Sequence, residues 1–162
     1  MAEVPDAVLL VVGPGGPFRE RLNAEVAALP AADRIRFLPG VAPDEIPAWT
    51  AAADVAAMPI QPTTLNHRLT TPTRLFDALG AGVPVVASDL PGMAAIVKAT
   101  GCGLVCDPTD PSSIATAING ILDAPPERRQ AYREAALAAG RGPYAWERQV
   151  QTLLGVYRRL AP

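Results

Sequence analysis

Short runs of apolar residues alternate along the chain with longer segments in which apolar residues recur at helical spacing. The apolar runs predict strands at residues 7–12, 35–38, 54–60, 84–88 and 103–107. Nearly continuous apolar runs of this kind are typical of parallel strands that are covered on both faces. The alternation of strands and helices therefore predicts an α/β fold, a Rossmann-like three-layer α/β/α domain with a mostly parallel sheet of about five strands.

The segments between these runs carry helical periodicity and helix-start signals. They predict helices at residues 17–29, 44–53, 91–100, 110–124, 126–139 and 144–160, and one more that begins near residues 70–73. Pro17 takes a first-turn position, and Asp110 followed by Pro111 marks a helix start. Residues 61–69 predict a long polar loop. Because no internal repeat or low-complexity linker interrupts the pattern, residues 1–162 are predicted to form a single domain.

Composition narrows the classes of function. A chain of 162 residues with 49% apolar residues can bury a substantial core. The net charge of −2 gives no electrostatic basis for binding nucleic acid or an anionic membrane. No apolar run reaches the roughly 18 residues of a membrane span, so no transmembrane segment is expected. The first residues lack the pattern of a signal peptide, so a cytoplasmic location is expected.

The two cysteines, Cys102 and Cys106, do not predict a metal site. A four-ligand zinc site would need further thiols or imidazoles, and His67 is the only histidine. We expect two reduced thiols on or near a buried strand. No other cluster of residues suggests a metal site, and no metal or cofactor is expected.

The strongest candidate chemistry lies at the start of the helix near residue 70. Ligands of open parallel sheets collect beyond the carboxyl ends of the strands, and the longest loop there leads into this helix. Thr70 and Thr71 precede its first turn, where free N–H groups and the guanidinium of Arg74 could bind a diphosphate. Asp77, three residues on, could accept hydrogen bonds from ribose hydroxyls. The alternative is a surface ion pair between Arg74 and Asp77.

Two further features have weaker signals. The glycine-rich loop at residues 13–16 could let backbone N–H groups approach a phosphate, but it matches neither common phosphate-binding motif and equally suits a tight turn. His67 lies in the long loop, where it could contact a ligand or be an ordinary polar residue. No catalytic triad and no pair of catalytic carboxylates can be assigned.

The stretch TTPTRLFDALGAGVPVVASDLPG, with its flanking segments, resembles a known family. It is similar to the C-terminal, donor-binding half of GT-B glycosyltransferases, in particular the retaining enzymes of group 1. The similarity extends over nearly the whole chain, including the closing segment YAWERQVQTLLGVYRRL. It implies a hexosyltransferase-type enzyme that binds a nucleotide sugar.

The resemblance implies roles for individual residues. Arg74 takes the place of a basic residue that binds the donor diphosphate. Asp77 stands where the family usually has a Glu that binds the ribose, with about one methylene less reach. The loop at 13–16 matches a glycine-rich loop that lines the donor cleft, and Gly40 and Val41 match a segment that meets the base. The donor contacts implied in all are Gly13, Gly15, Gly16, Gly40, Val41, Asn66, Thr70, Thr71, Arg74, Leu75 and Asp77.

The sequence also departs from the family pattern. Many members have an acidic residue eight positions before the ribose-binding carboxylate, where it contacts the donor sugar, and here that position is Leu69. Asn66, His67 or Thr70 could substitute. The separate N-terminal acceptor domain is absent, as is a strand, turn and helix that normally precede residues 6–12. That strand lies mid-sheet, and its gap could be filled by another chain, closed by its neighbours or left open.

The implied reaction transfers a sugar from a nucleotide-diphosphate donor to an acceptor hydroxyl. Arg74 and the helix N-terminus would stabilise the charge that develops on the departing diphosphate. With the acceptor domain missing or supplied by a partner chain, the isolated chain is expected to catalyse little. Contact with a membrane would come through that absent domain. The alternatives are a non-catalytic binding or assembly module, and half of a nucleotide-sugar epimerase.

Overall fold

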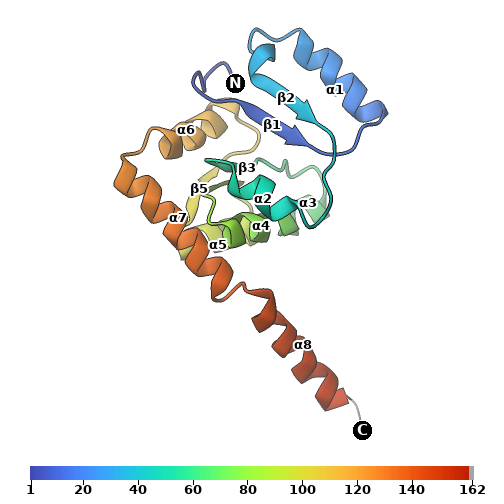
Figure 1. The fold of residues 1–162 in the computed structure, drawn as a ribbon, viewed down its shortest axis with the longest axis vertical. Coiled ribbons are helices and arrows are strands. Elements are labelled where there is room, and N and C mark those ends of the chain that lie inside the picture. Colours follow the sequence, from blue (N-terminus) through green and yellow to red (C-terminus); the bar gives the residue numbers. More distant parts are fainter. Residues whose placement is uncertain (161–162) are drawn as a thin grey trace. The chain divides into compact units, whose positions relative to one another are not determined.

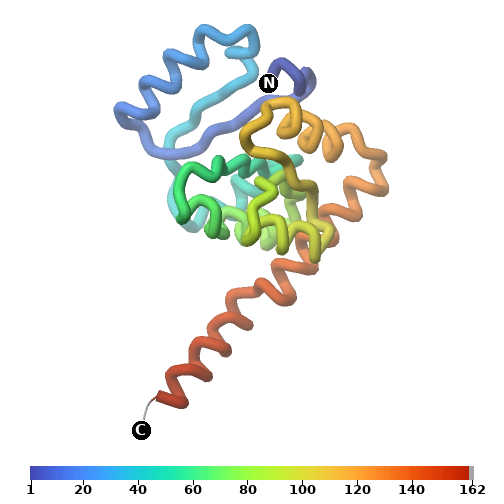
Figure 2. Tube along the Cα trace, turned by 180° about the vertical axis from the view of Figure 1, so that it is seen from behind, coloured from blue at the N-terminus to red at the C-terminus, as the bar shows by residue number. Residues whose placement is uncertain are grey.

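The computed structural model describes residues 1–160, which fall into two compact units. The first unit is Met1–Ile46, and the second begins at Pro47. Figures 1 and 2 show the chain from opposite sides.

The first unit is a small parallel βαβ arrangement. It contains β1 (Leu9–Val12), α1 (Pro17–Ala27), a short 3₁₀ turn (Ala32–Arg34) and β2 (Ile35–Leu38). The two strands pair in parallel, with Leu9 opposite Ile35 and Val12 opposite Leu38. Figure 1 shows α1 running beside β2. The predicted strand at 35–38 and the predicted helix start at Pro17 are confirmed.

The predicted burial of residues 7–12 is wrong. The strand there is β1, and the exposed fractions of Leu9, Leu10 and Val12 are 38%, 50% and 40%. Among the described residues β1 pairs with β2 alone, so one strand edge has no neighbour. Val4 and Ala31 are the buried residues of this unit, and such a small unit cannot cover both faces of its strands.

The second unit holds a three-stranded parallel sheet in the order β3-β4-β5. Its strands are β3 (Ala56–Met58), β4 (Val85–Ser88) and β5 (Gly103–Cys106). The helices are α2 (Ile46–Ala51), which begins at the boundary of the units, α3 (Leu65–Leu69), α4 (Thr73–Ala81), α5 (Pro91–Thr100), α6 (Pro111–Leu122), α7 (Pro126–Arg141) and α8 (Trp146–Leu160).

The core of the second unit forms on both faces of β4. Val85 and Ala87 of β4 pack on one face with residues of α4, α5 and α7. Val86 packs on the other face with Cys106, Ile121 of α6 and Tyr132 of α7. Successive side chains of a strand point to opposite faces, so an all-apolar strand fits a layer between helices. This confirms the predicted three-layer α/β/α fold with parallel strands.

The five predicted strands are present, but among the described residues they form two sheets. No strand of the pair β1-β2 is hydrogen-bonded to the trio β3-β4-β5. The linear pattern of apolar runs predicts strands and their parallel direction. The pattern does not show which strands pair with each other, so it does not predict where a sheet is continuous.

Local signals explain most helix bounds. Asp110 caps α6 by accepting a hydrogen bond from the N–H of Ser112 at 2.9 Å, as the sequence predicts. Gly82 ends α4 in the left-handed region at φ 67°, where the chain turns into β4. The helix predicted at 44–53 is shorter and covers Ile46–Ala51; Glu45 lies in the preceding turn, where its side chain accepts a hydrogen bond from the N–H of Ala42.

The predicted loop at 61–69 contains a helix, α3, which is a correction. Thr64 takes the N-cap position, and its hydroxyl accepts a hydrogen bond from the N–H of His67 at 3.1 Å. The side chains of Thr63 and His67 also share a hydrogen bond, of 2.8 Å. Threonine caps of this kind start a helix in a polar segment that has no clear apolar periodicity.

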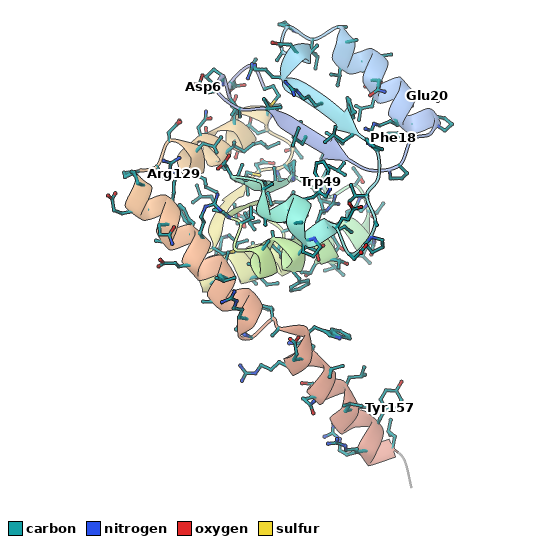
Figure 3. The ribbon with its side chains drawn as sticks, viewed as in Figure 1. Asp6, Phe18, Glu20, Trp49, Arg129 and Tyr157 are labelled. Atoms are coloured by element: carbon teal, nitrogen blue, oxygen red, sulfur yellow. The ribbon has the colours of Figure 1, made fainter. Side chains whose placement is uncertain are left out.

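α8 has an exposed apolar surface. None of its residues is buried, and the exposed fractions of Trp146, Tyr157 and Leu160 are 69%, 63% and 76%. Figures 1 and 2 show α8 extending from the end of α7, and Figure 3 shows the side chain of Tyr157 projecting from it. In residues 1–160, no helix has the length and apolar character needed to cross a membrane.

Candidate functional site

The start of α4 exposes backbone N–H groups. The N-cap residue is Pro72, which has an extended backbone and no side-chain group to cap the helix. The N–H of Leu75 bonds to the carbonyl of Pro72 at 2.9 Å. The amides of Thr73 and Arg74 have no partner in the described part of the chain. Such a helix start favours an anionic group.

Arg74 and Asp77 are both unpaired within residues 1–160. Arg74 is exposed and Asp77 is half-buried. The ion pairs of the described chain do not include them, and neither side chain makes a hydrogen bond there. The structure therefore does not support the alternative of a surface ion pair. Burial without a compensating partner raises the pKa of the Asp77 carboxyl above its ordinary value.

The position of both side chains is set by the opposite flank of α4. Leu75, Ala78 and Leu79 are fully buried in the core, which fixes the rotation of the helix. The ring of Phe76 packs on that of Tyr144 at 5.8 Å between centroids. Leu75 was predicted as a donor contact, but its side chain belongs to the core and its N–H is already bonded to Pro72.

The loop before α4 is packed against the start of α5. A Cβ atom placed on Gly92 would lie 2.6 Å from the hydroxyl oxygen of Thr71 and 3.1 Å from the carbonyl oxygen of Thr70. Only glycine lets the two segments approach this closely. Gly92 thus holds two predicted site residues in place, a role that sequence reasoning did not assign to it.

A buried hydroxyl fixes the loop that follows β3. Ser88, at the end of β4, is fully buried and donates to the carbonyls of Met58 and Ile60, at 3.2 and 2.8 Å. Asn66, predicted as a further contact, lies exposed on α3 beyond this loop. The backbone at the end of β3 and directly after it is therefore fixed, while α3 presents polar side chains to solvent.

The candidate residues of the first unit form a second group. The N–H of Gly13 bonds to the carbonyl of Leu38 at 3.3 Å, and a Cβ atom on Gly40 would lie 3.4 Å from the nitrogen of Pro14. Gly16, at φ 138°, is the N-cap of α1 and has no side chain to cap it. The structure thus brings the predicted loop 13–16 beside Gly40, with Val41 next in the chain.

Arg19 joins these two loops, and sequence reasoning missed it. Its guanidinium donates to the carbonyl of Gly13 at 2.8 Å and to the carbonyl of Leu38 at 2.8 Å. It also stacks over the ring of Phe37, 4.7 Å from the centroid. No sequence motif marks this arginine, because its partners are backbone atoms brought close by the fold.

A separate cleft of about 570 Å³ lies at the carboxyl ends of β4 and β5. Asp89 and Asp107 line it; Asp89 pairs with Lys98 at 2.7 Å, and Asp107 accepts hydrogen bonds from Thr109. Those bonds lower the pKa of Asp107, so its carboxylate is charged at neutral pH. Carboxylates in the lining make this cleft less suited to a diphosphate than the start of α4.

The cysteines are buried thiols, as predicted. Cys102 packs in the core cluster that includes residues of α4, α5 and α7, and Cys106 packs in the cluster on the opposite face of the sheet. Burial raises the pKa of both thiols, and the charges of Asp107 and Asp89 add to the increase for Cys106. Within residues 1–160, no group of three or more potential metal ligands is found.

Comparison with known proteins decides the family. The family described as Glycosyl transferases group 1 matches residues 1–138. The chain belongs to this family. Among its relatives is the D-inositol 3-phosphate glycosyltransferase of Acidothermus cellulolyticus, which is 33% identical over 93% of this chain. The GDP-mannose-dependent alpha-(1-6)-phosphatidylinositol monomannoside mannosyltransferase of Mycolicibacterium smegmatis is 36% identical over 75% of it.

Solved glycosyltransferase structures share the fold of this group 1 chain. Sucrose-phosphate synthase from Thermosynechococcus elongatus superposes with a TM-score of 0.83 and 26% identity, over 99% of this chain and 40% of that protein. Anabaena HepE in complex with UDP and glucose superposes with a TM-score of 0.74 and 21% identity, over 94% and 41%. These matches confirm the GT-B fold. The chain spans about a third of the length of the two sequence relatives, 32% of each.

Proposed function

We propose that this chain is the donor-binding part of a glycosyltransferase that moves a sugar from a nucleoside diphosphate sugar to an acceptor hydroxyl. The observation that carries the proposal is the start of α4. There, unbonded amides at Thr73 and Arg74, an unpaired guanidinium and an unpaired carboxylate lie within two turns of one helix. Its relatives support the proposal, since one is named as GDP-mannose-dependent and HepE was solved with UDP and glucose.

The proposed mechanism rests on charge. When the bond from sugar to diphosphate breaks, negative charge grows on the leaving phosphate. The guanidinium of Arg74 and the helix start stabilise that charge where it develops, and because both are already in place, little reorganisation is needed. Asp77 binds the ribose hydroxyls, which restores hydrogen bonds that its half-buried carboxylate lacks.

The acceptor and any catalytic base are proposed to come from elsewhere, either an acceptor domain or a partner chain. The chain by itself is therefore expected to bind nucleotide weakly and to transfer little sugar. Rapid turnover of a nucleotide sugar by the isolated chain would contradict this. A cytoplasmic location is part of the proposal, and membrane contact would come through the acceptor part.

The test is calorimetric titration of the chain with UDP, GDP, ADP and TDP, repeated with Arg74→Ala. Removal of a guanidinium that bonds a phosphate should weaken binding of the preferred nucleotide about tenfold or more. The control is Arg21→Ala, which removes the same charge from an exposed side chain that pairs with Glu25 at 3.6 Å. Affinity unchanged by Arg74→Ala would favour a non-catalytic assembly module with no donor site at α4.

A further inference from the structure

Arg19 has three backbone carbonyls around its guanidinium and no carboxylate partner among the described residues. It donates to Gly13 and Leu38 at 2.8 Å each, and lies 3.4 Å from the carbonyl oxygen of Val11. The guanidinium also stacks over the ring of Phe37. A charged donor that is half-buried and bonded to neutral carbonyls forms stronger bonds than a neutral donor would.

The carbonyls that Arg19 holds lie at the carboxyl ends of the two strands. Gly13 follows the end of β1, and Leu38 is the last residue of β2. Each is followed by a proline, Pro14 or Pro39, so neither peptide offers an N–H at that point. One side chain therefore sets the orientation of both peptide planes from which the loops 13–16 and 39–41 depart.

Few other contacts join the two loops. The two loops are joined directly by the 3.3 Å bond from Gly13 to Leu38 and by the close approach of Gly40 to Pro14. Gly13, Gly15 and Gly16 have no side chains with which to fix the loop. Glycine backbones sample many conformations, so a loop of this composition depends on external anchors for a defined shape.

We propose that Arg19 is a positioning residue, which holds the glycine loop and the Gly40 segment in the arrangement that receives the nucleotide. This rests on the proposed function, because the two loops matter only if a nucleotide binds there. Arg19 itself acts through the backbone and does not touch the ligand. Its neighbour Arg21, on the same helix, contacts Glu25 and the ring of Phe18 and has no bond to either loop among the described residues, so it is the matched control.

The first readout does not involve a ligand. Arg19→Met, Arg19→Lys and Arg21→Met are compared by ¹H–¹⁵N NMR and amide hydrogen exchange in the intact chain. Arg19→Met should shift the signals of Gly13, Gly15, Gly16 and Gly40, and should speed exchange of the Gly13 amide about tenfold. Exchange at Leu10 of β1 and Arg36 of β2, in the paired strands of the same unit, should stay unchanged, which separates loop release from unfolding of that unit.

The second readout is affinity for UDP and GDP. Arg19→Met should weaken the preferred nucleotide about tenfold, and Arg21→Met should leave it unchanged. Arg19→Lys should be intermediate, because an ammonium group reaches one of the two carbonyls without the planar fork of arginine. This variant also retains the charge if the methionine variant fails to fold.

The outcomes separate this proposal from the proposed function. Unchanged loop signals in Arg19→Met would overturn the positioning role. Altered loop signals with unchanged nucleotide affinity would also overturn the positioning role. In that case loss of binding in Arg74→Ala would still support the donor site. Wild-type protein that binds none of the nucleotides would overturn the proposed function and, with it, the purpose assigned to Arg19. Altered loop signals, weaker binding and unchanged exchange at Leu10 and Arg36 would support it.

Discussion

The position of Asp77 lowers the stability of the free protein but suits the binding of a ligand. Its carboxylate is half-buried, has no hydrogen-bond partner within residues 1–160 and has a raised pKa. A group whose pKa is higher in the folded protein than in the unfolded chain favours folding only while it is protonated. The charged form therefore lowers the stability of the free protein at neutral pH.

Asp77→Asn should consequently stabilise the free protein at pH 7 while weakening its affinity for nucleotide. The difference in free energy of unfolding between Asp77→Asn and wild type should vanish below the ordinary pKa of Asp. It should grow as the pH rises through the raised pKa of Asp77. Urea unfolding between pH 3 and pH 7, with parallel nucleotide titrations at pH 7, measures both effects.

The matched variant is Asp54→Asn. Asp54 is 81% exposed at its side chain and pairs with Arg133 at 3.5 Å, so its loss should slightly lower stability or leave it unchanged. If Asp77→Asn destabilised the protein more than Asp54→Asn at neutral pH, the carboxylate would have a structural partner, contrary to its place in a ligand site.

The sequence predicts the charged residues of this site better than their supports. Arg74 and Asp77 are identifiable because their residue types and spacing on one helix have a chemical meaning. Arg19 and Gly92 are not, because their roles depend on backbone atoms distant in sequence, at Leu38 for the first and at Thr71 for the second. Contacts of that kind are created by the fold and leave no local pattern.

At the scale of elements, α4 is held by its contact with α7. A Cβ atom on Gly140 of α7 would lie 2.6 Å from the carbonyl carbon of Leu79 and 2.7 Å from the nitrogen of Gly80. The two helices therefore meet backbone to backbone. The same contact fixes the helix that carries Arg74, so site geometry and helix packing are linked.

Gly140→Ala should destabilise the protein by about 1–3 kcal/mol, because the added methyl group has to push two backbones apart. Thermal or urea unfolding measures this change. Nucleotide affinity should fall in parallel if α4 shifts.

Gly80→Ala is the contrasting variant. A Cβ atom on Gly80 meets nothing within 4 Å, so alanine should raise stability by about 0.5–1 kcal/mol through its helix propensity. Equal effects of the two substitutions would show that helix propensity, and not close packing of α4 on α7, controls stability here.

Helices with strong end signals were predictable, and α3 was not. α5 and α6 begin at Pro91 and Pro111 as the sequence indicates. α3 spans only five residues and depends on one threonine cap, so its sequence has the polar composition of a loop. Short helices of this kind are stabilised by a single cap and by neighbouring segments, neither of which has a periodic signature.

At the scale of the whole molecule, the chain has five parallel strands in two sheets within residues 1–160. Continuous apolar runs predicted each strand and its direction. The sequence did not predict whether the two sheets are continuous, because apolar runs do not show which strands pair. The side chains of β1 are exposed because the first unit has one α-helix, α1, to cover the two faces of a two-stranded sheet.

The central claim, a donor site at the start of α4, is tested most directly by NMR of the ¹⁵N-labelled chain titrated with UDP and with GDP. Binding at this site predicts that the amides of Thr71, Thr73, Arg74 and Asp77 shift most, while those of α8 stay in place. Saturable binding whose shifts leave the start of α4 untouched, or no binding of either nucleotide at millimolar concentration, would contradict it.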